Sequence, residues 1–357
     1  MRDHTEDLAA LLPGAEVDLL LVTELVNVRY LTGYTGSNGL ALIGPELRVF
    51  ATDFRYREQV AEEVDPSFER REVPRDLVTA LTDVLPDGAL RLGFEAGHMS
   101  VRDSGRLRGQ LPERIELAAL DGLPERLRAV KDAEEIARMR SATALADRAF
   151  ERVVGTGLVG KTEREVALAL EVEMRLAGAQ RPSFEAIVAA GPHGALPHAQ
   201  PRDVEIGAGA LVVIDWGAEL DGYCSDCTRT VATGELDGQA MEIYALVLDA
   251  QLAGLGTVRA GAACKEVDGV ARAVIDSAGQ GERFGHGLGH GVGLEVHEAP
   301  TLSRTSDGTL EDGNVVTVEP GVYLPGAFGV RIEDLVVARP DGPELLTELS
   351  KELTTVD

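Results

Sequence analysis

Short aliphatic runs alternate with amphipathic stretches along the first third of the chain. Runs of apolar, often β-branched residues bounded by Gly, Pro or Asp predict buried strands, and apolar residues at helical spacing predict helices. The expected strands are 17–22, 40–43, 47–51 and 91–94, and the expected helices are 55–63 and 77–85. Strands alternating with helices predict an α/β domain built on a central sheet. The pattern becomes irregular between 111 and 131, around Pro112 and Pro124, so we place a domain boundary there, giving domains 1–127 and 128–357.

The second domain is expected to begin with a pair of helices. Asp132–Glu135 and Thr162–Glu165 have the composition of capping boxes and open helices that run to about 154 and 177, with Gly178 as a stop signal. A second helix pair is expected at 238–253 and 266–277. The expected strands of this domain are 184–190, 211–216, 223–232, 315–319 and 329–337. Two helices followed by strands, occurring twice, predict an α+β domain of two similar halves.

The chain is strongly acidic, with 60 Asp and Glu against 34 Lys and Arg and a formal net charge of −26. Such a surface repels phosphate backbones and anionic lipid, so we expect neither a nucleic acid nor a membrane as partner. Apolar runs such as 210–214 fall far short of the roughly 20 residues that span a bilayer. Three cysteines do not make a disulfide framework, and the first residues lack the pattern of a secretory signal, so a cytoplasmic location is expected.

An Asp-Gly pair at 221–222, between two strand-like runs, predicts a hairpin with a type I′ turn. In that register Gly217 falls opposite Asp226, and Asp215 becomes a diagonal neighbour of Asp226 on the same face. Two carboxylates so close need a cation or a shared proton. The alternative is a solvated hairpin that carries ordinary surface acids.

Three of the seven histidines of the chain, His286, His290 and His297, lie within twelve residues and are interleaved with glycines. Glycine weakens regular structure but lets backbone and imidazole approach a ligand closely. The glycine content argues against a zinc-binding helix of the His-x-x-x-His type. We therefore expect a functional, non-helical segment here.

Two further acids lie at strand ends or within strands. Glu319 closes a β-branched run just before Pro320-Gly321. In an extended segment 329–337, Arg331 and Glu333 share one face, for which a structural salt bridge is the alternative to a functional role. Two Asp, two Glu and one or more His make a ligand set that suits Mn, Co, Fe or Zn. Two such ions can generate hydroxide at neutral pH, which indicates hydrolysis.

Taken together, these clusters resemble those of the pita-bread-fold metallopeptidases, namely aminopeptidase P and prolidase. The matching motifs are Asp215-x-Gly217 with Asp226, the run from His286 to Glu298, Glu319-Pro320-Gly321, and Arg331-Ile332-Glu333-Asp334. Residues 27–33 with 35–37 resemble the N-terminal domain that the short bacterial members share with creatinase. The resemblance implies a creatinase-like α/β domain followed by a pita-bread catalytic domain.

The resemblance also implies roles for individual residues. The implied ligands of two divalent ions per subunit are Asp215, Asp226, His290, Glu319 and Glu333, with Asp226 and Glu333 bridging both ions. Asp215 completes one site, and His290 and Glu319 complete the other. Glu319 is also the implied acid/base, and His297 contacts the scissile carbonyl. His198 is the implied substrate-side histidine, while His286 and Arg331 line the pocket.

From this resemblance we expect an aminopeptidase P that cleaves the Xaa-Pro bond at the amino end of short peptides. The nearest alternative is prolidase, which is restricted to Xaa-Pro dipeptides, and a remoter one is a non-catalytic peptide-binding protein of this fold. We expect Mn²⁺ as the metal, with Co²⁺, Zn²⁺ or Fe²⁺ as alternatives, and a homodimer.

Overall fold

The computed structural model describes residues 3–357, and the chain divides into two compact units, Met1–Arg128 and Ala129–Asp357. Each unit has its own core of buried aliphatic and aromatic side chains. None of the helices in residues 3–357 combines the length and the apolar character that a membrane crossing requires.

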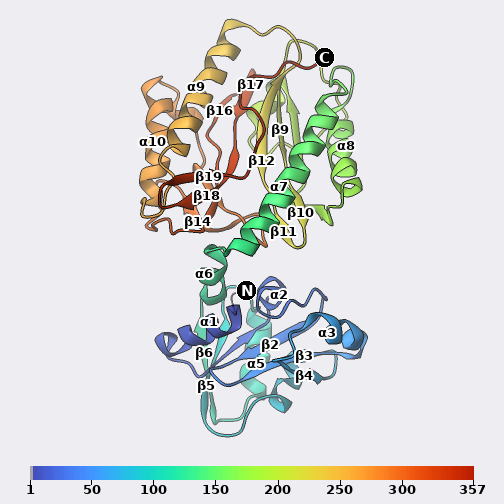
Figure 1. The fold of residues 1–357 in the computed structure, drawn as a ribbon, viewed down its shortest axis with the longest axis vertical. Coiled ribbons are helices and arrows are strands. Elements are labelled where there is room, and N and C mark those ends of the chain that lie inside the picture. The colour runs from blue at the N-terminus through green and yellow to red at the C-terminus, as the bar shows by residue number, and fades with distance from the viewer. Residues whose placement is uncertain (1–2) are drawn as a thin grey trace. The chain divides into compact units, whose positions relative to one another are not determined.

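The first unit is a six-stranded sheet with helices (Figure 1), in the strand order β4-β3-β2-β1-β5-β6. Its strands are β1 (Leu19–Val22), β2 (Gly39–Ile43), β3 (Arg48–Thr52), β4 (Glu69–Glu72), β5 (Leu90–Glu95) and β6 (Ile115–Leu120). Its helices are α1 (His4–Leu11), α2 (Leu25–Thr32), α3 (Arg57–Glu63), α4 (Leu77–Ala80), α5 (Val101–Gln110) and α6 (Leu123–Ala129). The sheet is mixed, because β1 pairs antiparallel with β2 but parallel with β5.

The segment expected to be irregular, 111–131, is regular in the structure, so that prediction is wrong. It holds strand β6, which pairs parallel with β5, and then helix α6. Pro124 does not interrupt α6, because it lies in the first helical turn, where a backbone N–H has no helical acceptor.

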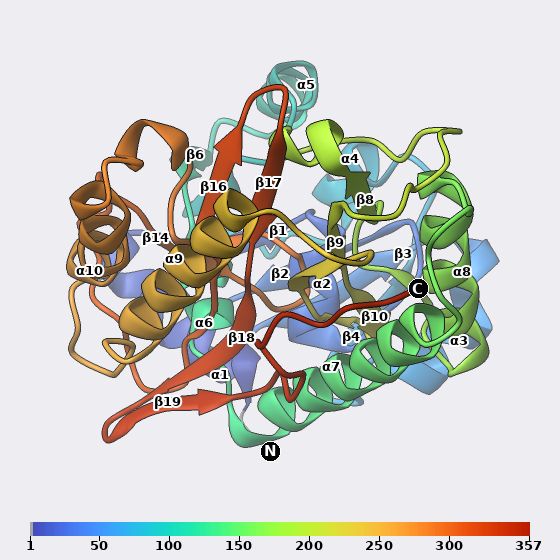
Figure 2. The same cartoon turned by 90° about the horizontal axis from the view of Figure 1, so that it is seen from above.

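The second unit places its strands between two helix pairs, with α7 and α8 on one side and α9 and α10 on the other (Figures 1 and 2). The helices are α7 (Ala133–Val154), α8 (Glu163–Leu176), α9 (Gly238–Leu255) and α10 (Cys264–Ser277). The strands of the first half are β7 (Arg181–Pro182), β8 (Ile187–Ala190), β9 (Leu211–Trp216), β10 (Ala218–Leu220), β11 (Tyr223–Cys224) and β12 (Cys227–Ala232). Those of the second half are β13 (Gly289–Gly291), β14 (Glu298–Leu302), β15 (Val315–Val318), β16 (Gly321–Leu324), β17 (Phe328–Arg331), β18 (Asp334–Arg339) and β19 (Gly342–Leu345).

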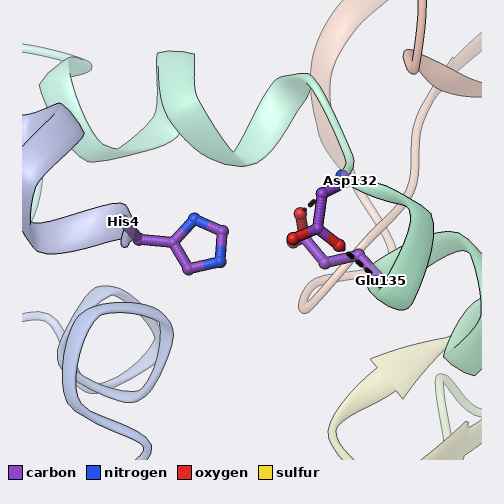
Figure 3. Close-up of side chains that lie close together, drawn as sticks. All are labelled: His4, Asp132 and Glu135. Atoms are coloured by element: carbon purple, nitrogen blue, oxygen red, sulfur yellow. Dashed lines mark hydrogen bonds between the residues drawn. The ribbon is translucent and has the colours of Figure 1, made fainter. Parts of the chain in front are cut away.

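Both expected capping boxes are present. At the start of α7 the Asp132 carboxylate accepts the N–H of Glu135, and the Glu135 carboxylate accepts the N–H of Asp132 (Figure 3). Thr162 and Glu165 make the same reciprocal pair at the start of α8. Each pair gives acceptors to N–H groups that have no partner inside the helix, which fixes where the helix begins.

The hairpin that the Asp-Gly pair predicts is also present. Asp221 and Gly222 both have positive φ, as a type I′ turn requires, and Leu220 pairs with Tyr223. The same register continues beyond the turn, since Trp216 pairs with Cys227 and Asp215 with Thr228.

The segment 329–337 was expected to be one strand and is two. Strand β17 ends at Arg331 and pairs with β16, whereas β18 starts at Asp334 and pairs with β15. Ile332 and Glu333 lie at the change of sheet. Despite the break, the side chains of Arg331 and Glu333 both hydrogen-bond to Thr228, whereas Asp334 is fully buried and its carboxylate accepts from Arg229 and Gln251.

A buried aspartate on α7 makes the stability of the second unit depend on pH. Burial raises the pKa of Asp147 to about 6, although its Oδ2 accepts the N–H of Glu348. A carboxyl whose pKa is raised by folding stabilises the fold while it is protonated, and this contribution is lost as the pH rises through about 6. We therefore expect Asp147→Asn to raise the free energy of unfolding by about 1 to 3 kcal/mol at pH 8 and to have a smaller effect at pH 4.

Urea unfolding at the two pH values measures this difference. Asp249→Asn, at an exposed aspartate of α9, is the matched control and should change neither value. If the free energy of unfolding changed with pH in the same way in the wild type and in Asp147→Asn, the raised pKa of Asp147 would be contradicted.

Candidate metal centre

All nine residues singled out from the sequence line one cavity of about 430 Å³ in the second unit. They are His198, Asp215, Asp226, His286, His290, His297, Glu319, Arg331 and Glu333. Apolar side chains, among them Phe184, Ile187 and Val296, form part of the same wall. The cavity therefore combines a dense group of ionisable side chains with an apolar surface.

Asp215 and Asp226 come from the two arms of the hairpin, Asp215 from β9 and Asp226 from just before β12. Gly217, between the two acids, lies close to the opposite arm. A Cβ built on it would stand 2.0 Å from the carbonyl oxygen of Ser225. Glycine is therefore required here because the two backbones approach each other, and this approach holds both acids on one face.

The histidine and glycine run forms loops and the short strand β13, as its composition predicted, and no helix. His290 lies on β13 between two glycines, and a Cβ on Gly289 would stand 2.1 Å from the carbonyl oxygen of Thr317. The Nδ1 atom of His290 lies 3.1 Å from the carbonyl oxygen of Gly291, so that Nε2 faces the carboxylates. Close packing of β13 on β15 thus aims the imidazole into the cavity.

Three of the expected ligands form a tight group. Asp226, His290 and Glu333 each offer one ligand atom, and these atoms all lie within 4.8 Å of one another. Glu319 adjoins this group, with its Oε1 3.3 Å from Nε2 of His290. Asp215 lies beside it and forms an ion pair with Arg331, whose Nη2 is 2.6 Å from its Oδ2.

The electrostatics of the group show an excess of buried negative charge. Burial raises the pKa of Asp226 well above its usual range, and the carboxylates of Glu333 and Asp215 raise it further. The pKa of Glu333 is raised in the same way, by burial and then by Glu319. Glu319 differs, because burial raises its pKa but is outweighed by the hydrogen bond and charge of His290 together with the charges of His286 and Arg331, so its pKa is lowered. Without a compensating cation these acids oppose one another's ionisation.

Two oxygen atoms in the group test whether a metal fits. Asp215 Oδ1 and Glu333 Oε1 are buried and lack a hydrogen-bond partner within the described part of the chain. Buried polar atoms are normally hydrogen-bonded, so two orphaned carboxylate oxygens in one cavity need another partner. Four carboxylates with one imidazole are the donors that first-row divalent ions prefer. The residues present fit such ions.

Arg331 is buried and its donors are committed to protein groups. Beyond Asp215, it donates to the Thr228 hydroxyl through Nε and to the Tyr323 hydroxyl and the Pro197 carbonyl through Nη1. Arg331 therefore forms a salt bridge, and its partner is Asp215 of β9, which the sequence did not indicate. Arg331 also lines the cavity. Its partner Thr228 in turn donates to Oε2 of Glu333 at 2.6 Å, so Arg331 is linked to Glu333 through this hydroxyl.

A buried arginine behind the cavity fixes the backbone at Glu333. The guanidinium of Arg229 donates to the carbonyl oxygen of Glu333 and to Oδ1 of Asp334. It also donates to the carbonyl oxygens of Leu349 and Ser350 in the C-terminal segment. This network explains how Glu333 can be held at a point where the chain passes from one sheet to another.

The other histidines occupy different parts of the wall. His286 hydrogen-bonds through Nε2 to the hydroxyl of Tyr323, at 2.9 Å. The ring centroid of His297 lies 4.3 Å from that of His290. Burial lowers the pKa of His297, and the neighbouring His290 and, more weakly, His198 contribute to this shift.

Two site residues escaped the sequence reasoning, namely Thr228 and Tyr323. The hairpin register contained the signal for Thr228, because it pairs directly with Asp215. Tyr323 gave no comparable signal, since its partners His286 and Arg331 come from other segments.

Comparison with known proteins gives matches over almost the whole chain. Residues 137–340 match metallopeptidase family M24, and residues 5–130 match the creatinase/prolidase N-terminal domain. The chain is 33% identical over 357 residues to the Xaa-Pro dipeptidase of Pyrococcus furiosus, with coverage of 99% of this chain and 100% of the relative.

Two solved structures extend the comparison. The Xaa-Pro dipeptidase from Bacillus anthracis superposes with a TM-score of 0.95 at 38% identity, covering 99% of each chain. The X-Pro aminopeptidase from Thermotoga maritima superposes with a TM-score of 0.90 at 37% identity, covering 99% of this chain and 100% of the other.

Proposed function

Because this chain belongs to metallopeptidase family M24 and is a metal-dependent Xaa-Pro peptidase, we propose that it is a Xaa-Pro dipeptidase, or prolidase. The expectation from the sequence was aminopeptidase P, with prolidase as the alternative. The comparisons support the alternative better, since the relatives named as Xaa-Pro dipeptidases or prolidases include those of two Pyrococcus species and of Bacillus anthracis. The reading as a non-catalytic peptide-binding protein is set aside.

The observation that carries the proposal is the meeting of four carboxylates and one imidazole at one apolar-walled cavity. We propose that Asp215, Asp226, His290, Glu319 and Glu333 would hold two divalent ions. Family M24 implies divalent metal, and Mn²⁺ is our proposal for its identity. When bound, two divalent ions supply a water of lowered pKa and withdraw electron density from a carbonyl group.

The side chains of the protein then transfer protons and orient the substrate. Glu319 accepts the proton of the attacking water and delivers it to the departing proline nitrogen. Its lowered pKa means that the carboxylate is ionised beforehand and has a free position for that proton. His297 donates a hydrogen bond to the carbonyl oxygen as negative charge develops there. His286 and His198, which both line the cavity, contact the substrate. Arg331, whose donors are largely committed, acts as a positioning residue for Asp215 and, through Thr228, for Glu333.

Proline is the residue that this chemistry accommodates. A peptide bond to proline has no N–H, so a peptidase that recognises that hydrogen cannot bind it. The arrangement here needs only the carbonyl oxygen and the ring nitrogen, and Phe184, Ile187 and Val296 offer apolar surface for a ring. The expected homodimer and the expected cytoplasmic location stay predictions.

Hydrolysis assays of the Mn²⁺-loaded protein test the proposal. We expect cleavage of an Xaa-Pro dipeptide, slower or no cleavage of the matching Xaa-Pro-Yaa tripeptide, and none of an Xaa-Ala dipeptide. Preference for the tripeptide would restore the aminopeptidase P reading. Failure to cleave either proline peptide would contradict the proposed activity.

A further inference from the structure

The carboxylate of one buried glutamate outside the cavity accepts hydrogen bonds from several groups. Glu163, the first residue of α8, is 1% exposed. Its Oε1 accepts the N–H of Ala190 at 3.0 Å, and its Oε2 accepts the N–H of Arg202 at 3.1 Å. Both oxygens also contact Nδ1 of His193, at 2.9 and 3.0 Å, and the Arg202 guanidinium, at 3.1 Å.

These donors belong to the two ends of one loop. The connection from β8, which ends at Ala190, to β9, which begins at Leu211, starts with the loop 191–202. This loop opens with a 3-10 helix at Gly191–Ala195 and contains no strand. Ala190 and His193 lie at the start of this loop and Arg202 at its end, so one carboxylate closes it. The backbone of the same helical turn adds two bonds, since the N–H groups of Glu163 and Arg164 donate to the carbonyls of Val204 and Arg202.

The middle of this loop forms part of the cavity. Residues 197–201 all line it, and His198 among them is the histidine assigned to the substrate side. The loop is also attached on the cavity side, where Arg331 donates to the carbonyl oxygen of Pro197. The position of His198 is thus set by two attachments, one from the cavity and one from Glu163 behind the loop.

An ordinary acid in the first turn of a helix would be solvated and would act on the helix alone. Glu165, two residues on, fits that description, because it is exposed and its carboxylate accepts the N–H of Thr162 in the capping box. Glu163 is buried, and most of its partners lie outside the helix. Its pKa is lowered, since hydrogen bonds from Arg202, Ala190 and His193 outweigh the effect of burial. The carboxylate is therefore charged while it holds the loop.

We propose that Glu163 is a positioning residue that closes the loop 191–202 and thereby places His198 against the substrate. This inference rests on the proposed function for the role of His198, but the closure of the loop does not. In Glu163→Gln one acceptor oxygen remains for the N–H of Ala190, the imidazole of His193 and the donors of Arg202, so at least one buried donor loses its partner. The loop then keeps, at this end, the two backbone bonds from Glu163 and Arg164 but not the full set of side-chain bonds.

Hydrogen exchange followed by mass spectrometry tests the closure directly. In Glu163→Gln, peptides covering residues 190–202 should exchange about tenfold faster, with the rest of the second unit unchanged. Glu165→Gln is the matched control: it makes the same charge change in the same helical turn and should leave this segment as in the wild type. Unchanged exchange of 190–202 in Glu163→Gln would overturn the proposal.

A double-variant cycle tests the link to His198. Glu163→Gln should lower kcat/KM for an Xaa-Pro dipeptide by about tenfold and should change KM and kcat in the same proportion as His198→Ala does. The variant that combines both should be no slower than His198→Ala alone, because the two changes remove one function. Metal content should stay at the wild-type value, since the five proposed ligands lie on other segments. Additive losses would mean that Glu163 does not act through His198.

Arg202→Gln provides a second test of the loop attachment in case the Glu163→Gln protein does not fold. Arg202 is half-exposed, and this change removes only the guanidinium bonds, so it should give faster exchange of 190–202 and a smaller loss of kcat/KM. A Glu163→Gln protein that fails to fold while Arg202→Gln exchanges as the wild type would count against the proposal. If His198→Ala alone had full activity, the assignment of His198 under the proposed function would fail, while the exchange measurement would still decide on the closure.

Discussion

The Asp226→Asn variant is expected to lose both bound metal and activity, with kcat/KM for an Xaa-Pro dipeptide lower by about 10³-fold or more. Asp226 stands in the group that also holds His290 and Glu333, and we assign it as a ligand shared by both ions. An amide carries no charge, so neither proposed ion would be adequately balanced. Elemental analysis of the purified protein and steady-state kinetics measure the two losses.

The stability of the metal-free protein separates this effect from misfolding. The pKa of Asp226 is raised well above its usual range by burial and by neighbouring carboxylates, so its charge opposes folding when no metal is bound. The melting temperature of chelator-treated Asp226→Asn should therefore equal or exceed that of the chelator-treated wild type. Glu235→Ala, at an exposed acid beyond β12, is the control and should keep metal and activity. Full metal content in Asp226→Asn would remove this residue from the site.

The His297→Ala variant is expected to keep its metal and to lose activity by about 10²- to 10³-fold, mainly in kcat. The ring of His297 packs beside that of His290, yet it is outside the group of ligand atoms. Its burial lowers its pKa, which keeps the imidazole neutral and able to donate a single N–H to a developing oxyanion. Metal analysis together with kcat and KM distinguishes this outcome from that of a lost ligand.

His297→Gln serves as the conservative comparison, because its amide also carries an N–H donor. It should recover part of the rate that alanine loses. Equal rates for the wild type and His297→Ala would exclude a role at the scissile carbonyl, and loss of metal in His297→Ala would point to a ligand instead.

Much of the fold follows from local chemistry that a sequence displays. The family matches and the superpositions confirm a creatinase-like domain followed by a pita-bread catalytic domain. The Asp221-Gly222 turn sets the register that brings Asp215 and Asp226 to one face, because only this turn type suits two residues of positive φ. The capping boxes at Asp132 and Thr162 fixed two helix starts for the same kind of reason.

The failures have physical causes as well. Pro124 was taken as an irregularity, although proline is favoured in a first helical turn, and strand β6 alternates only weakly between buried and exposed positions. The break between β17 and β18 is set by which strands the two pieces pair with, β16 and β15, and no local pattern shows that. Tyr323 and Glu163 act through partners far away along the chain, so their importance is visible only after folding.

The distribution of charge has a consequence for how the site is maintained. The cavity holds more buried carboxylate than its cations Arg331 and, where protonated, His290 can balance. Such an arrangement costs stability unless divalent ions bind. We therefore expect Mn²⁺, bound by the proposed ligands, to stabilise the metal-free wild type.

Diffraction from crystals of the Mn²⁺-loaded protein, with anomalous scattering recorded at the manganese edge, is the most direct test of the metal centre. We predict two anomalous peaks in the cavity, both bonded to Asp226 and Glu333, with Asp215 completing one and His290 and Glu319 the other. A cavity without anomalous peaks, or manganese bound elsewhere while these five side chains bond to nothing in common, would contradict the assignment.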